Sequence, residues 1–194
     1  MYALLLALWP LCLFFSAPIL GDLSDRFGRK KVILSCLFGE AVAYLLGAAA
    51  VSMQSLSLMI LSRVIAGVFA GSQPIAQAAI ADISTKENKT RNMSKIVLAT
   101  TLGVVLGPLI GGFTANSQLV SFFSYATPFQ IAAVIALLNA VLLIFAFKET
   151  HVVKHDVKVK WLKAVSLFTD AFKNKQISII SVSYTHLTLP TIGE

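Results

Sequence analysis

Ionisable side chains in this sequence occur in two settings that could support chemistry. The first is a short segment, residues 21–30, in which two glycines, the acid Asp25 and several cations lie between two apolar runs. The second is the interior of the apolar runs, which carries the cation Arg63 and the acid Glu40. An ionisable group inside a long apolar run is a functional candidate, because burying it in lipid costs at least about 2.5 kcal/mol on insertion scales.

Five apolar stretches must position these groups. The chain of 194 residues is 57% hydrophobic and 13% charged, whereas an ordinary soluble domain carries about 25% charged residues. A helix needs about 20 apolar residues to cross a hydrocarbon core, and five stretches reach that length: residues 2–21, 32–53, 56–80, 96–115 and 128–147. We therefore predict an all-α membrane protein with five transmembrane helices. The alternative is a soluble helical bundle, whose helices would show polar faces.

The charge of the connections alternates along the chain. Lys and Arg concentrate after the first, third and fifth apolar stretches, whereas the connections at residues 52–57 and 116–127 hold no charged residue. Because Lys and Arg mark cytoplasmic loops, we predict a cell-membrane protein whose N-terminus faces outward. Residues 148–176 then form a cytoplasmic linker with an amphipathic helix. This topology explains the net charge of +7 without nucleic-acid binding.

Residues 21–30, here called the signature segment, have a composition suited to a structured turn. Gly21 and Gly28 permit a tight reversal of the chain. Asp25 can accept hydrogen bonds from a helix N-terminus, where a negative charge is favoured. The segment is held in the cytoplasm by its cations, Arg26, Arg29 and Lys30. The simpler alternative is a basic loop that only sets topology.

Small residues form stripes on two of the predicted helices. Gly67 and Gly71 follow Arg63 at i+4 and i+8, so they share its face and permit another helix to approach closely. The stretch 96–115 carries a longer stripe, in which a proline bends the helix: Gly103, Gly107, Pro108, Gly111 and Gly112. These residues are candidates for helix packing.

The two ionisable groups inside the apolar runs lie at different depths. Counted along their helices, Arg63 and Glu40 differ by roughly 13 Å in depth, so we expect no direct salt bridge between them. Glu40 shares the depth of Ser72 and Gln73, and it either carries protons or merely tolerates burial. Gln73 and Gln77 either line a substrate path or hydrogen-bond within the bundle. Arg63 has a structural alternative too, in which its guanidinium binds carbonyls.

Together these features resemble the drug:proton antiporter branch of the major facilitator superfamily of transporters. The signature segment matches the pattern G-x-L-x-D-R-x-G-R-K, and Arg63, Gly67 and Gly71 match R-x-x-x-G-x-x-x-G. Residues 107–112 match the antiporter pattern of the fifth helix. The resemblance implies that the five spans are helices two to six of a twelve-helix fold, without the first helix and the C-terminal half. Glu40 is a departure, since the family usually has a small or neutral residue there.

The resemblance also implies a function. It implies secondary active transport by alternating access, in which proton influx drives the export of small molecules. The implied partners are the substrate, protons, the lipid bilayer and the missing C-terminal half of the same protein. Asp25 and its neighbouring cations would latch the two halves on the cytoplasmic side. Arg63 would take part in proton coupling, with Glu40 as a second candidate. The glycine–proline stripe would seal the half against leakage. An uptake symporter, or a non-transporting scaffold or receptor with the same fold, is the alternative.

The remaining sequence features suggest no further activity. The sequence shows no nucleophile–base constellation, phosphate-binding loop or cysteine metal site, so we predict neither an enzyme nor a cofactor. Residues 177–181 are interpreted as the start of a truncated span, and residues 182–194 resemble a translated sequencing adapter. We expect the chain on its own to be inactive in transport.

Overall fold

The computed structural model describes residues 2–118 and 120–150, and these ranges contain six helices. They are α1 (Tyr2–Phe27), α2 (Arg29–Ser52), α3 (Leu56–Phe69), α4 (Ser72–Asp82), α5 (Lys89–Thr114) and α6 (Thr127–Ala146). Taken as one span, α3 and α4 join the other four helices to make five that are long and apolar enough to cross a membrane. The prediction of five membrane-spanning helices is confirmed. The predicted linker helix and the C-terminal tail lie outside the described residues.

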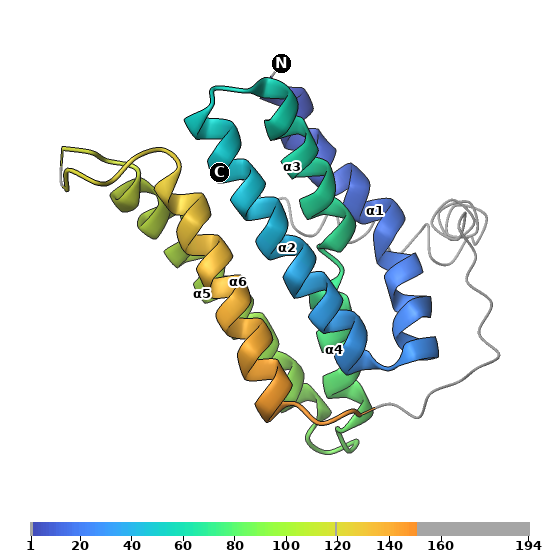
Figure 1. Cartoon of the computed structure of the whole chain (residues 1–194). Coiled ribbons are helices and arrows are strands. Elements are labelled where there is room, and N and C mark those ends of the chain that lie inside the picture. The colour runs from blue at the N-terminus through green and yellow to red at the C-terminus, as the bar shows by residue number, and fades with distance from the viewer. Residues whose placement is uncertain (1, 119, 151–194) are drawn as a thin grey trace, which may run out of the picture.

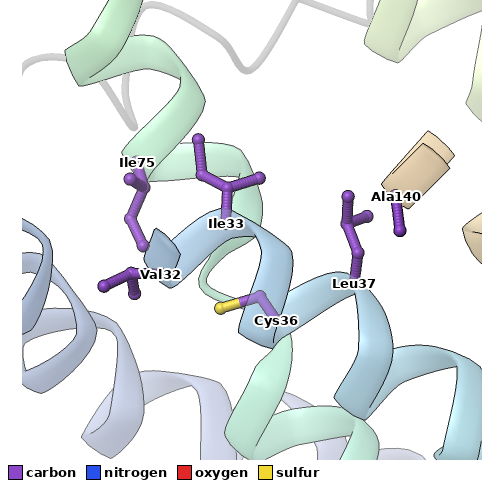
Figure 2. Packing of buried hydrophobic residues seen from close by; sticks show 6 residues of the cluster. All are labelled: Val32, Ile33, Cys36, Leu37, Ile75 and Ala140. Carbon is purple, nitrogen blue, oxygen red and sulfur yellow. The ribbon is translucent and has the colours of Figure 1, made fainter. Parts of the chain in front are cut away.

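The helix α2 is the centre of the bundle. It packs against α1, α3, α4 and α6, while α5 lies on the far side of α6 and contacts α4 and α6 (Figure 1). The buried cluster in Figure 2 lies mainly on α2, with one residue each from α4 and α6: Val32, Ile33, Cys36, Leu37, Ile75 and Ala140. A helix suits each of these apolar segments because its backbone hydrogen bonds are all made internally, as a lipid environment requires.

The turn between α1 and α2 consists of a single residue, Gly28. Its φ of +98° lies in a region that glycine adopts without penalty and other residues rarely enter. The expectation that Gly21 also takes part in the reversal is wrong. Helix α1 continues to Phe27, so Gly21 lies inside it. The chain leaves helical geometry only at Gly28, where φ becomes positive.

The apolar stretch 56–80 does not form one uninterrupted helix. It breaks at Ala70 and Gly71, between α3 and α4. Pro74 has no N–H to donate to the carbonyl of Ala70, four residues before it. Gly71 adds a second weakness, since glycine is a poor helix former. The prolines of α1 and α5 leave their helices continuous, and none of them follows a glycine by three residues: Pro10, Pro18 and Pro108.

The glycines of the third span allow α1 to pack closely on it. A Cβ added at Gly67 would lie 2.5 Å from Cβ of Cys12 and 2.7 Å from the backbone oxygen of Trp9, and one added at Gly71 would collide with Leu20. Ser16 of α1 is buried and donates a hydrogen bond of 3.0 Å to the carbonyl of Gly67. Helix α1 therefore contacts the third span through backbone as well as side chains.

The basic connections gather at one end of the bundle. The turn at Gly28, the connection from α4 to α5, and the chain after α6 all lie at the lower end of Figure 1. The turn between α2 and α3 and the connection between α5 and α6 lie at the opposite end (Figure 1). This arrangement has the alternation that the charge pattern predicts. Which end faces the cytoplasm stays a prediction.

Candidate functional site

The signature segment is organised around Arg29. Its side chain is only 10% exposed, and its Nη1 lies 2.7 Å from Oδ1 of Asp25, one turn earlier. Its Nε donates to Oδ2 of Asp82 at 3.2 Å, which joins the start of α2 to the end of α4. Nη1 also donates to Oγ of Ser24, a side chain that is itself fully buried. One guanidinium thus connects three helices, through an ion pair with Asp25 and hydrogen bonds to Ser24 and Asp82.

The other cations of the signature segment have different surroundings. Arg26 is exposed and lies over the ring of Phe27, 5.3 Å from its centroid. Lys30 extends its Nζ to the backbone oxygen of Ile144 in α6, at 2.8 Å. The sequence pattern made these cations equivalent. In the structure Arg29 is buried, whereas Arg26 and Lys30 are more exposed.

A carboxylate from the chain after α6 completes this group. Oε1 of Glu149 accepts a hydrogen bond from the backbone N–H of Arg29 at 2.9 Å, and its Oε2 accepts one from the N–H of Lys30 at 3.1 Å. Sequence reasoning missed both Glu149 and Asp82. Each is an acid directly at the end of an apolar run, and that position was the available signal.

Arg63 lies on α3, half-buried within the bundle. Its Nε and Nη2 are buried and have no hydrogen-bond partner among the described residues. Its guanidinium carbon lies 5.2 Å from the centroid of the Phe129 ring in α6, a distance that permits a cation–π interaction. The aromatic ring attracts the charge but accepts no conventional hydrogen bond. The carbonyl-bonded arrangement considered for Arg63 is not the one described, at least for these two nitrogen atoms.

Glu40 faces the break in the third span. Its Oε1 accepts a hydrogen bond of 3.1 Å from Oγ of Ser72, the first residue of α4. The expectation that Glu40 lies near Ser72 agrees with this contact. Glu40 and Arg63 differ in these contacts: the acid accepts a hydrogen bond from the start of α4, whereas the cation lies against a ring of α6.

The remaining candidates fall outside these two groups. Gln73 and Gln77 are exposed on α4. The stripe on α5 has no neighbour: an added Cβ would meet nothing within 4 Å among the described residues at Gly103, Gly107, Gly111 or Gly112. The packing role expected of this stripe has no partner within residues 2–118 and 120–150. No cluster of three or more potential metal-binding side chains occurs in those ranges.

The geometry is that of a helical membrane bundle with an ionic cluster at one end and two ionisable groups inside. The sequence profile of the Major Facilitator Superfamily matches residues 1–191. The chain therefore belongs to the Major Facilitator Superfamily, as its motifs indicate.

Relatives and a solved structure agree with this assignment. Over 150 residues the chain is 37% identical to the class C tetracycline resistance protein of Escherichia coli, which covers 77% of this chain and 36% of that protein. Over 182 residues it is 30% identical to the class B protein of Escherichia coli, covering 92% and 43%. The crystal structure of the human organic anion transporter MFSD10 superposes with a TM-score of 0.68 at 26% identity, covering 82% of this chain and 35% of that one. The chain thus spans less than half the length of these proteins.

Proposed function

We propose that the protein to which this chain belongs exports small molecules by proton-coupled alternating access. Its relatives include tetracycline resistance proteins, at identities of 30% and more, which supports export over uptake. The substrate class proposed is therefore small, drug-like molecules. The N-terminus of the chain faces outward in this proposal, and the end that carries Arg29 faces the cytoplasm.

The observation that carries the proposal is the state of Arg63. Nε and Nη2 of Arg63 are buried and have no hydrogen-bond partner among the described residues, an arrangement that is unfavourable for a charged group inside a helical bundle. An unsatisfied cation inside a membrane bundle attracts an anionic or proton-carrying group during a transport cycle. Arg63 is thus the residue proposed to couple proton movement to the conformational change. Glu40 is a second ionisable group available to a proton path, since its carboxylate faces the break between α3 and α4.

The ionic cluster supports a latch at the cytoplasmic end. Arg29 holds Asp25 and Asp82 together, so that the end of α1, the start of α2 and the end of α4 form one connected group. In this proposal a second six-helix half closes against that group and separates from it in each cycle. The exposed stripe on α5 then becomes a surface for packing against helices outside the described residues.

A proton-release assay tests the proposal. Everted membrane vesicles containing the full-length protein are acidified inside by respiration, and tetracycline is then added. Antiport predicts that adding the drug releases protons from the vesicles and that radiolabelled drug accumulates inside them.

The other transport modes give different results in the same vesicles. A symporter accumulates no drug against this gradient, and a scaffold or receptor moves neither drug nor protons. Either result, with the protein shown to be present in the vesicle membrane, contradicts the proposed antiport. A panel of other drug-like compounds run in parallel separates the choice of substrate from the direction of transport.

A further inference from the structure

The start of α2 is held by a side chain from a distant part of the sequence. The first amides of a helix have no acceptor within the helix, and no side-chain cap comes from Gly28, the residue that precedes α2. Instead both carboxylate oxygens of Glu149 are used, one on the N–H of Arg29 and one on the N–H of Lys30. These contacts span 120 and 119 positions of the sequence. A negative charge is favoured at this end of a helix by the helix dipole.

Gly28 provides the space for this carboxylate. A Cβ built on Gly28 would lie 2.5 Å from Oε2 of Glu149 and 3.0 Å from its Cδ. The position is therefore restricted to glycine twice, by its φ of +98° and by the carboxylate packed against it. The glycine of the signature segment and the acid after α6 form one fitted pair.

A second contact runs in the opposite direction between the same elements. Nζ of Lys30 donates to the carbonyl oxygen of Ile144, near the end of α6, at 2.8 Å. The last carbonyls of a helix receive no hydrogen bond from an N–H of the same helix, and they carry partial negative charge. A cation is therefore favoured there. Glu149 thus accepts hydrogen bonds at the start of α2, and Lys30 donates one at the end of α6.

We propose that Glu149 is the positioning residue of the signature segment. It caps α2 so that Arg29 is held between Asp25 and Asp82, and it ties this cluster to the chain that follows α6. The role as a latch rests on the proposed function; the cap itself does not. In a two-half transporter the chain after α6 leads toward the second half. Glu149 is therefore placed to connect the latch with that connecting segment.

Hydrogen exchange at single-residue resolution tests the cap directly. The chain is reconstituted in lipid nanodiscs, and exchange is measured at the amides of Arg29 and Lys30. Because their acceptor is Glu149, we expect Glu149→Ala to accelerate exchange at these two amides about tenfold, the size of a typical N-cap contribution. Glu149→Gln keeps the shape but has one acceptor oxygen, so we expect a smaller increase. Lys148→Ala, at the exposed neighbouring position, is the matched control and should leave both amides unchanged.

A double-variant cycle separates the cap from a general loosening of the fold. Gly28→Ala places a Cβ where the carboxylate lies, so it should accelerate the same amides. Combined with Glu149→Ala it should add little, because both changes remove one interaction. Unchanged exchange at Arg29 and Lys30 in Glu149→Ala would overturn the proposal, and so would an equal acceleration throughout α2. Should Glu149→Ala fail to fold, the same criteria apply to Glu149→Gln.

Transport measurements on the full-length protein keep this proposal apart from the proposed function. A cap that is present in a protein that moves no protons contradicts antiport but leaves the cap standing. With antiport established, we expect Glu149→Ala to lower the maximal rate of efflux and to leave the substrate concentration at half-maximal rate near that of the wild type. The reverse pattern would overturn the positioning role, since it would mean that Glu149 acts on substrate binding.

Discussion

At the scale of single residues, two arginines of the sequence motifs, Arg29 and Arg63, have opposite surroundings. Arg29 forms ion pairs with Asp25 and Asp82, so its charge has carboxylate partners beside it. Arg63 lies against the ring of Phe129, and its buried Nε and Nη2 have no acceptor within residues 2–118 and 120–150. The satisfied arginine suits a structural connection, and the unsatisfied one suits a group that changes partners during a cycle.

Replacing Arg63 tests that difference. In the full-length protein we expect Arg63→Ala to reduce drug-dependent proton release to the empty-vector level while the protein still reaches the membrane. Arg63→Lys should restore only part of the activity, because an ammonium lacks the planar fork of the guanidinium. Lys95→Ala, at an exposed cation on α5, is the control. Normal proton release by the Ala variant would leave Arg63 a structural role only.

The glycines provide a second residue-scale prediction. Gly67→Ala should lower the free energy of unfolding by about 1–3 kcal/mol, the range for overpacking, because its Cβ would meet the backbone oxygen of Trp9 at 2.7 Å. Gly103→Ala is the matched control: its Cβ meets no described residue within 4 Å, so the better helix propensity of alanine should leave stability equal or slightly higher. Detergent-induced unfolding of the reconstituted chain measures both. Equal destabilisation by the two changes would contradict the packing described for α1.

At the scale of elements, the break in the third span is the feature that shapes the interior. It places Ser72 at the first position of α4, where its hydroxyl reaches Glu40 of α2. A continuous helix through residues 70–74 would carry Ser72 on a regular turn and change that contact. The break therefore positions one of the two ionisable groups inside the membrane.

Restoring the missing backbone donor tests the cause of the break. In Pro74→Ala the N–H of residue 74 becomes available to the carbonyl of Ala70, so we expect a continuous helix across residues 70–74. Hydrogen exchange at residues 71–76 should then slow relative to the wild type. Pro18→Ala in α1, where the helix is already continuous, should produce no comparable change there. Faster exchange at 71–76 in Pro74→Ala would show that packing, and not the proline, opens the span.

At the scale of the whole molecule, the two ends of the bundle differ in charge. One end gathers the basic connections, and the other holds the uncharged ones (Figure 1). Lys and Arg near the ends of spans resist translocation. The charge difference thus predicts the orientation of every span at once.

Thiol labelling in intact cells tests that orientation. In a background without Cys12 and Cys36, cysteines placed at Ser55 and Gln118 should react with a membrane-impermeant reagent. A cysteine at Asn88 should react only after the cells are opened. Labelling of position 88 in intact cells, with position 118 protected, would invert the predicted topology.

The sequence by itself determined the number of spans and the motifs of the signature segment. Both depend on local properties: run length against the thickness of a bilayer, and residue types at short spacing. The match to the Major Facilitator Superfamily and the five apolar helices agree with what those properties predict. A glycine turn in the signature segment was also predicted, but the sequence named both Gly21 and Gly28, and only the structure shows that Gly28 alone has the positive φ.

Only the tertiary structure decided which groups meet. Glu149 and Arg29 are 120 positions apart, and nothing in local composition pairs them, since many acids and cations lie near span ends. The break at Gly71 escaped prediction for a different reason: Pro10, Pro18 and Pro108 lie in uninterrupted helices, so the presence of a proline does not by itself predict a break. Contact between distant segments depends on how the helices pack around α2. That packing sets the distances over which hydrogen bonds and charges act, and sequence spacing does not contain them.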